Sequence, residues 1–287
     1  MPAESLDLNV LLALSGQILM LLCGVGVLWR LMFSAEGRAA QRGPKPLPPW
    51  SINGAEFGMA VLAVVAGGIA GQIAAVLIAA QLTTDENVML TIGGAGFQGG
   101  LLAGAGIAYI SILKPAQRNA ARGHDEPPAL PGTKAVNLWI AGPYTLLAAM
   151  PVLFVVNLTW VFLLESLGLS VEKQELVNIF AETDSPIVLI GMSFLAVVVA
   201  PLVEEVIFRA GLFRFLRTRL PRWAAFVLPA AIFGSLHGNL VAFMPLFMLG
   251  IVFAVAYERT GRISVPILAH ALFNLNTILL LLAGVEV

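Results

Sequence analysis

Residues 8–33 read LNVLLALSGQILMLLCGVGVLWRLMF, an almost unbroken apolar run in which Arg30 is the one charged residue. A helix needs about 20 consecutive apolar residues to cross the hydrocarbon core of a bilayer. The residues before the run include Glu4 and Asp7 and no Lys or Arg, whereas a secretory signal peptide opens with a basic region. We therefore expect residues 8–33 to form a membrane-spanning helix that is retained.

The rest of the chain has the same character. Of its 287 residues, 59% are hydrophobic and 11% are charged, against about 25% charged residues in soluble domains. This composition excludes an ordinary soluble protein, and the formal net charge of −1 gives no indication of a nucleic-acid partner.

Apolar runs of similar kind recur along the sequence. They predict an all-α fold, a polytopic transmembrane helix bundle of about eight spans. The fifth to eighth spans are shorter or contain proline, so their limits are less well defined. The expected spans are Leu8–Phe33, Gly54–Leu82, Val88–Leu113, Val136–Leu164, Pro186–Glu204, Trp223–His237, Leu240–Tyr257 and Ser264–Ala283.

The basic residues are distributed unequally between the loops. Fifteen of the sixteen Lys and Arg residues follow the odd-numbered spans, and only Lys173 lies on the opposite side. Basic loops face the cytoplasm in multi-pass proteins. We therefore expect an integral protein of a prokaryotic plasma (inner) membrane with both termini extracytoplasmic.

Three segments lie between the spans. Ser34–Trp50 and Lys114–Thr133 are rich in Pro, Gly and Arg, which predicts flexible cytoplasmic connectors. Val171–Thr183 alternates apolar and acidic residues, which favours a short amphipathic helix at the far membrane interface.

Glycines are frequent in the third span. Residues 94–99, GAGFQG, match the spacing of a dinucleotide-binding turn, but no strand precedes them and they lie inside an apolar run. Small residues allow membrane helices to approach closely, so helix packing explains these glycines better than a nucleotide site.

Polar residues interrupt the apolar sequence in the last third of the chain. Three patterns occur: EEVIFR at 204–209, FGSLH at 233–237 and HALFN at 270–274. Ionisable groups at membrane depth are costly and mark functional sites by default. The candidate residues are Glu204, Glu205, Arg209, His237, His270 and Asn274.

Helix arithmetic predicts that these residues share a depth. If the chain turns at Leu220-Pro221, Glu204 and His237 are equidistant from the turn, each roughly 24 Å away. This requires the fifth helix to continue past Arg209. Residues four apart share a helix face, so His270 can act together with Asn274, and Glu205 can pair with Arg209.

The order EExxxR, FxxxH and HxxxN resembles the CAAX-protease and bacteriocin-processing family of intramembrane proteases, also called the Abi family. Residues 257–263, YERTGRI, with Pro266 before His270, resemble the final motif of that family. The resemblance covers about residues 186–280 and does not extend to the first four spans.

The resemblance implies a metal-independent glutamic endopeptidase with no cofactor. Glu204 would be the general base, and His237 would help to position and activate water. His270 and Asn274 would stabilise the oxyanion of the tetrahedral intermediate, with Glu205 and Arg209 in support. The implied partners are the lipid bilayer and a membrane-associated protein or peptide substrate. A prenylated C-terminal tail, a bacteriocin leader and a regulatory membrane protein all remain open as that substrate.

Three alternatives remain open at this point. The ionisable residues could pair only for structural reasons. Two histidines and a glutamate could hold a catalytic zinc ion, although an HExxH spacing is absent. The chain could also be a transporter, scaffold or bacteriocin-immunity protein without proteolytic activity, but the sequence shows no inverted repeat of the kind found in transporters.

We divide the sequence accordingly into three regions. Residues 1–135 form an N-terminal transmembrane region, residues 136–185 hold the fourth span with the amphipathic segment, and residues 186–284 form the expected catalytic core.

Overall fold

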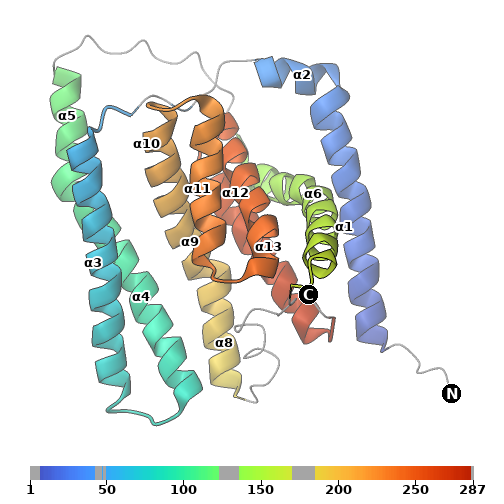
Figure 1. Cartoon of the computed structure of the whole chain (residues 1–287), viewed down its shortest axis with the longest axis horizontal. Coiled ribbons are helices and arrows are strands. Elements are labelled where there is room, and N and C mark those ends of the chain that lie inside the picture. The colour runs from blue at the N-terminus through green and yellow to red at the C-terminus, as the bar shows by residue number, and fades with distance from the viewer. Residues whose placement is uncertain (1–6, 43–46, 48–49, 123–135, 170–184, 286–287) are drawn as a thin grey trace. The chain divides into compact units, whose positions relative to one another are not determined.

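The computed structural model describes residues 7–42, 47, 50–122, 136–169 and 185–285. These residues form helices, and none of them lies in a strand. The helices are α1 Leu8–Phe33, α2 Ala35–Arg42, α3 Gly54–Ala79, α4 Glu86–Ala108, η1 Tyr109–Leu113, α5 Lys114–Arg122, α6 Leu138–Ser166, α8 Pro186–Phe194, η2 Leu195–Val199, α9 Ala200–Glu205, η3 Val206–Phe213, α10 Arg214–Arg217, α11 Arg222–Leu236, α12 Leu240–Thr260 and α13 Ser264–Leu282 (Figure 1).

The polytopic helical fold is confirmed. Among the described residues, seven helical runs are long and apolar enough to cross a membrane. The fifth run extends from Pro186 to Arg217, so this helix does continue past Arg209 as the depth argument requires. The expected span Trp223–His237 is not among these seven runs, because the corresponding helix, α11, has only 15 residues. At 1.5 Å per residue it reaches about 22 Å, less than the roughly 30 Å hydrocarbon core.

The helices fall into two compact units. Unit 1 comprises Met1–Lys45, Asn137–Thr183 and Phe226–Val287, and unit 2 comprises Pro46–Val136 and Asp184–Ala225. Each unit combines segments that are distant in sequence, so the units do not follow the three sequence regions expected above. That division of the sequence stays a prediction.

In unit 1, α6 is the central helix and packs against α1, α12 and α13. The hydrophobic core consists of buried residues from α6, α12 and α13, namely Ala149, Leu153, Leu249, Phe253 and Ala269. Gly142 of α6 lies so close to Leu268 of α13 that a Cβ atom there would meet the leucine side chain at 2.7 Å. The last helix is therefore held by a helix that precedes it by more than a hundred residues.

In unit 2, α3 and α4 form an antiparallel hairpin and lie side by side along their length (Figure 1). Three glycines of α4 lie against the α3 backbone: Gly96 against Gly71, Gly100 against Gly67, and Gly104 against Ala63. The packing interpretation of the glycine-rich span is confirmed, because a side chain at any of these positions would collide with backbone. On another side, α4 packs against α8, η2 and α9.

The long helix of unit 2 widens twice into π-helical turns, η2 and η3. Pro201 follows η2 and has no N–H to donate, and its ring would clash with a carbonyl of the preceding turn. The N–H of Ala200 instead bonds to the carbonyl of Leu195, five residues back. The wider turn gives the ring room, which is a usual accommodation of proline in membrane helices.

The two expected connectors are more regular than the sequence suggested. Ala35–Arg42 and Lys114–Arg122 are helical, so the expectation of flexible connectors is wrong for these residues. Both stretches consist mainly of Ala, Gln and Arg, which favour helix, and the Ser34 hydroxyl accepts a hydrogen bond from the Gly37 N–H. The expected amphipathic helix at Val171–Thr183 lies outside the described residues.

The α3–α4 interface can be tested with two adjacent glycines. Replacing Gly100 by alanine places a Cβ against Gly67, whereas a Cβ at Gly99 meets nothing within 4 Å. We expect Gly100→Ala to destabilise the protein by about 1–3 kcal/mol, the usual cost of overpacking, and Gly99→Ala to be neutral or slightly stabilising. Thermal unfolding in detergent measures both, and equal effects at the two positions would contradict the packing.

Candidate active site

The two adjacent glutamates of the first motif stand at the end of α9, between the two π-helical segments. Glu205 is completely buried, and Arg209 is 2% exposed. Nη1 of Arg209 lies 2.8 Å from Oε1 of Glu205. The ion pair expected from the i, i+4 spacing is therefore confirmed.

This ion pair makes the two carboxylates chemically different. Glu205 is held by a guanidinium in a buried position, where a hydrogen bond between ionised groups is strong. Glu204 is the more exposed of the two, since its side chain is only partly buried. The arrangement leaves Glu204 as the carboxylate better placed to exchange a proton with water.

The second and third motifs meet in unit 1. His237 follows the last residue of α11, and His270 lies on α13. The Phe233 ring is 4.8 Å from the His237 ring and 6.0 Å from the His270 ring between centroids, edge-on in both cases. One phenyl ring thus holds two imidazoles that are 33 positions apart in sequence.

A backbone contact sets the tautomer of His237. Its Nδ1 lies 2.8 Å from the carbonyl oxygen of Phe233. A carbonyl can only accept, so Nδ1 must carry the hydrogen, and the neutral ring then presents Nε2 as an acceptor. The residue is exposed, and Nε2 can therefore accept a hydrogen bond from a water molecule.

His270 is more deeply buried than His237. His270 is 3% exposed and lies 5.2 Å from the Phe253 ring. Asn274, one turn later on α13, is partly buried. The same helix is tied to α1, because Nε2 of Gln17 donates to Oδ1 of Asn276 at 2.6 Å. A polar contact between the first and last spans thus fixes the helix that presents His270 and Asn274.

The described contacts bring some of the expected site residues together. They join Glu205 to Arg209 in unit 2, and His237 to His270 through Phe233 in unit 1. Glu204 and His237 belong to different units, so their common depth stays a prediction. The turn on which the prediction rests is present, because the chain turns between Arg217 and Arg222.

Sequence reasoning gave too little weight to one ionisable residue. Glu258 on α12 is completely buried, although it was noted only as part of the YERTGRI segment. Its signal was the same as that of the other candidates, a carboxylate in an apolar helix. We therefore add Glu258 to the residues on which the fold of the site depends.

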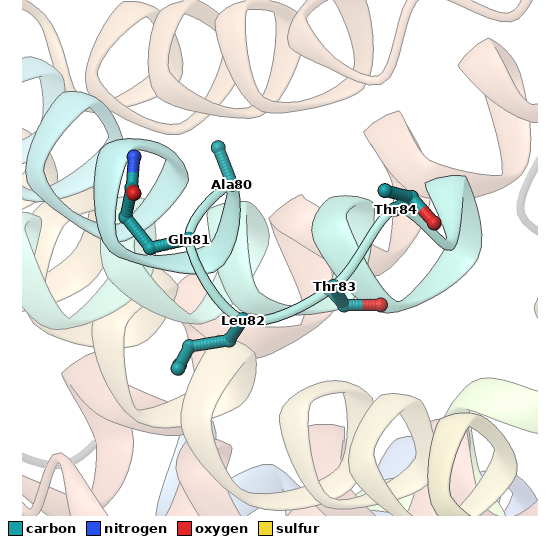
Figure 2. A pocket seen from close by; sticks show the side chains of 5 residues that line it. All are labelled: Ala80, Gln81, Leu82, Thr83 and Thr84. Atoms are coloured by element: carbon teal, nitrogen blue, oxygen red, sulfur yellow. The ribbon is translucent and has the colours of Figure 1, made fainter.

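Two hollows in the described part of the surface lie away from the three motifs. One of about 450 Å³ is lined by the turn between α3 and α4, Ala80, Gln81, Leu82, Thr83 and Thr84 (Figure 2). Another of about 550 Å³ lies along the same hairpin, with Gln72 and Glu86 in its lining. Neither lining includes a residue of the three motifs, and the first contains no ionisable side chain.

The buried ion pair yields a prediction about stability. Arg209→Met leaves the Glu205 carboxylate buried without its cation, which costs about 3–5 kcal/mol. The double variant Glu205→Met with Arg209→Met removes both charges and should recover a large part of that loss. Thermal unfolding in detergent measures the four proteins of this cycle. A double variant as unstable as the sum of the single variants would contradict the pairing.

Comparison with known proteins shows what these residues resemble. Residues 186–276 match the family described as type II CAAX prenyl endopeptidase Rce1-like. A protein of Bacillus subtilis (strain 168), named "Putative membrane peptidase YdiL", is 34% identical over 95 residues, which is 33% of this chain and 39% of that protein. An Escherichia coli protein, named "Uncharacterized 24.3 kDa protein", is 30% identical over 131 residues, 44% of this chain and 58% of that protein.

The chain therefore spans less than two thirds of the length of either relative. No solved structure matches the chain. The family match contains all three polar patterns, from Glu204 to Asn274. Residues 186–276 are thus an Rce1-like segment, which confirms the resemblance to the CAAX proteases that the three motifs predicted.

Proposed function

We propose that this chain is an intramembrane endopeptidase that hydrolyses a peptide bond in a membrane-associated or lipidated protein. One observation carries the proposal: the four candidate catalytic residues, Glu204, His237, His270 and Asn274, all lie within the segment that matches a family of CAAX endopeptidases. The buried ionisable groups in that segment support it, since such groups are retained in membranes mainly for function.

In the proposed reaction, water is the nucleophile. Glu204 accepts a proton from the water as its oxygen attacks the carbonyl carbon of the scissile peptide. Nε2 of His237 accepts a hydrogen bond from the same water and orients it. The proton then passes to the leaving amine as the carbon–nitrogen bond breaks. A positioned carboxylate that accepts a proton in the transition state is a usual form of general-base catalysis.

His270 and Asn274 have the second role. The attack turns the carbonyl oxygen into an oxyanion, and donors already oriented toward it lower the barrier. The ring N–H of His270 and the side-chain amide of Asn274 are suitable donors from a single face of α13. The burial of His270 between Phe233 and Phe253 restricts its ring, which favours a preorganised donor.

The proposed orientation follows from charge. The basic ends of the apolar helices face the cytoplasm, and both termini lie outside it. A substrate carrying a lipid would reach the site from the bilayer. The identity of the substrate is a matter for experiment, and comparison of membrane-proteome cleavage products between cells with and without a functional Glu204 would reveal it.

The first functional prediction concerns Glu204 and His237. We expect Glu204→Gln and His237→Ala each to lower peptide-bond cleavage by about 10²–10⁴-fold, the usual contribution of a general base. Both proteins should still insert and elute as the folded protein from a size-exclusion column. Cleavage is measured with the purified protein in detergent on prenylated and unprenylated peptides.

Glu165→Gln provides the matched control, because Glu165 is an exposed carboxylate near the end of α6. It should cleave at the wild-type rate. Retention of wild-type cleavage by both Glu204→Gln and His237→Ala would exclude this mechanism. A wild-type protein that cleaves no peptide but confers bacteriocin immunity would favour the non-proteolytic alternative.

The second functional prediction concerns metal. If Glu204 activates water directly, cleavage should stay within about twofold of its initial rate after dialysis against EDTA, because less than 0.5 kcal/mol of activation free energy is then lost. Loss of activity that zinc restores would instead indicate a metal-dependent peptidase, with the histidines as ligands.

A further inference from the structure

The end of the long helix in unit 2 carries a basic, aromatic surface that the proposed catalysis does not use. Four arginines lie within nine residues, at 214, 217, 219 and 222, and no acidic residue lies among them. The facing segment is Trp50–Phe57, in the same unit. Its single acidic residue, Glu56, is engaged in a capping box with Asn53 at the start of α3.

Three aromatic rings lie in series on this surface, with a guanidinium group at each end. The Arg214 guanidinium is 5.4 Å from the Trp50 ring centroid, and the Trp50 and Phe57 rings are 6.4 Å apart. Phe57 in turn stacks on Phe215 at 3.9 Å. At the other end of the stack, the Arg219 guanidinium carbon lies 3.9 Å from the Phe215 ring centroid. The stack fixes the positions of two cationic groups without neutralising either charge.

Two donors at one end of the stack have no acceptor among the described residues. They are the indole Nε1 of Trp50, a side chain that is 7% exposed, and Nε of Arg214. A buried donor without an acceptor costs free energy, and native structures have few of them. An anion with several oxygens would satisfy both groups, and phosphate is the anion that arginine recognises best.

The neighbouring residues have the character of a membrane interface. Trp223, next to Arg222, is 70% exposed, and exposed tryptophans gather at the level of the lipid headgroups. Arginine clusters at the ends of membrane helices bind anionic headgroups. The helix that ends here is one of the apolar runs able to cross a membrane, so its end lies where headgroups are found.

We propose that Trp50–Phe57 and the Arg214–Trp223 turn form a binding site for the phosphate of an anionic phospholipid, with Arg214 and Trp50 as its buried donors. Arg217 and Arg219 add charge and donate hydrogen bonds to the carbonyls of Leu47 and Ile52. The site is independent of peptide hydrolysis, and its test does not require activity.

The test measures lipid retention by the purified full-length protein. Wild type and variants are placed in nanodiscs of phosphatidylcholine alone or of equimolar phosphatidylcholine and phosphatidylglycerol, and lipids retained after extraction are counted by native mass spectrometry. Wild type should retain phosphatidylglycerol preferentially. Arg214→Gln should weaken that preference about fivefold, on the scale of one arginine at an anionic surface, and Arg214→Lys should keep most of it.

Arg30→Gln is the matched control. Arg30 is also an arginine near the end of an apolar helix, but it is paired with Glu36 at 3.0 Å, so its loss should leave lipid retention unchanged. Equal retention of the two lipids by wild type would overturn the proposal, and this comparison stands even if Arg214→Gln fails to fold. Displacement of the bound lipid by excess inorganic phosphate would also overturn it, because the site would then bind free phosphate rather than a headgroup.

Discussion

The buried Glu205–Arg209 pair is the interaction on which the long helix of unit 2 depends. An isolated charge at membrane depth costs several kcal/mol, so neither residue could be buried without the other. Their 2.8 Å contact joins consecutive turns of the helix. Because both side chains are buried, this face of α9 and η3 points into the protein, and the adjacent Glu204 is the more exposed carboxylate. The chemical difference between the two glutamates follows from this one contact.

The helices outside the Rce1-like segment pack against the helices of that segment. In unit 2, α4 packs against α8, η2 and α9, while α3 closes on α4 through glycines that allow backbone contact. In unit 1, α6 supports α12 and α13, and Gln17 on α1 binds Asn276 on α13. The early spans therefore hold the helices that present the polar motifs. This is a physical reason why the Rce1-like segment, about a third of the chain, requires the remaining helices.

Much of this could be predicted from the sequence. Hydropathy located α1, α12 and α13 to within a few residues, and the i, i+4 rule predicted the Glu205–Arg209 pair. Prediction from the sequence failed for features that do not change the pattern of polar and apolar residues. The wide turns around Pro201 leave hydropathy unchanged, and Phe233 reads as one more apolar residue although its ring contacts both histidines. The complete burial of Glu258 was not predicted, because burial depends on the neighbouring helices. The short length of α11 was not predicted either, because an apolar run does not reveal where a helix ends.

The π-helical segments have a consequence for how this protein can vary among its relatives. A π turn accommodates one residue more than the α turn it replaces, and π-bulges inside helices often occur at functional sites. Loss of one residue within η3 could be absorbed by a return to α-helix, whereas elsewhere in a helix it would rotate every later side chain by roughly 100°. A one-residue gap at this point of an alignment would thus be compatible with an intact helix on both sides. The arginines after Phe213 would then keep their orientation relative to the glutamates before Val206.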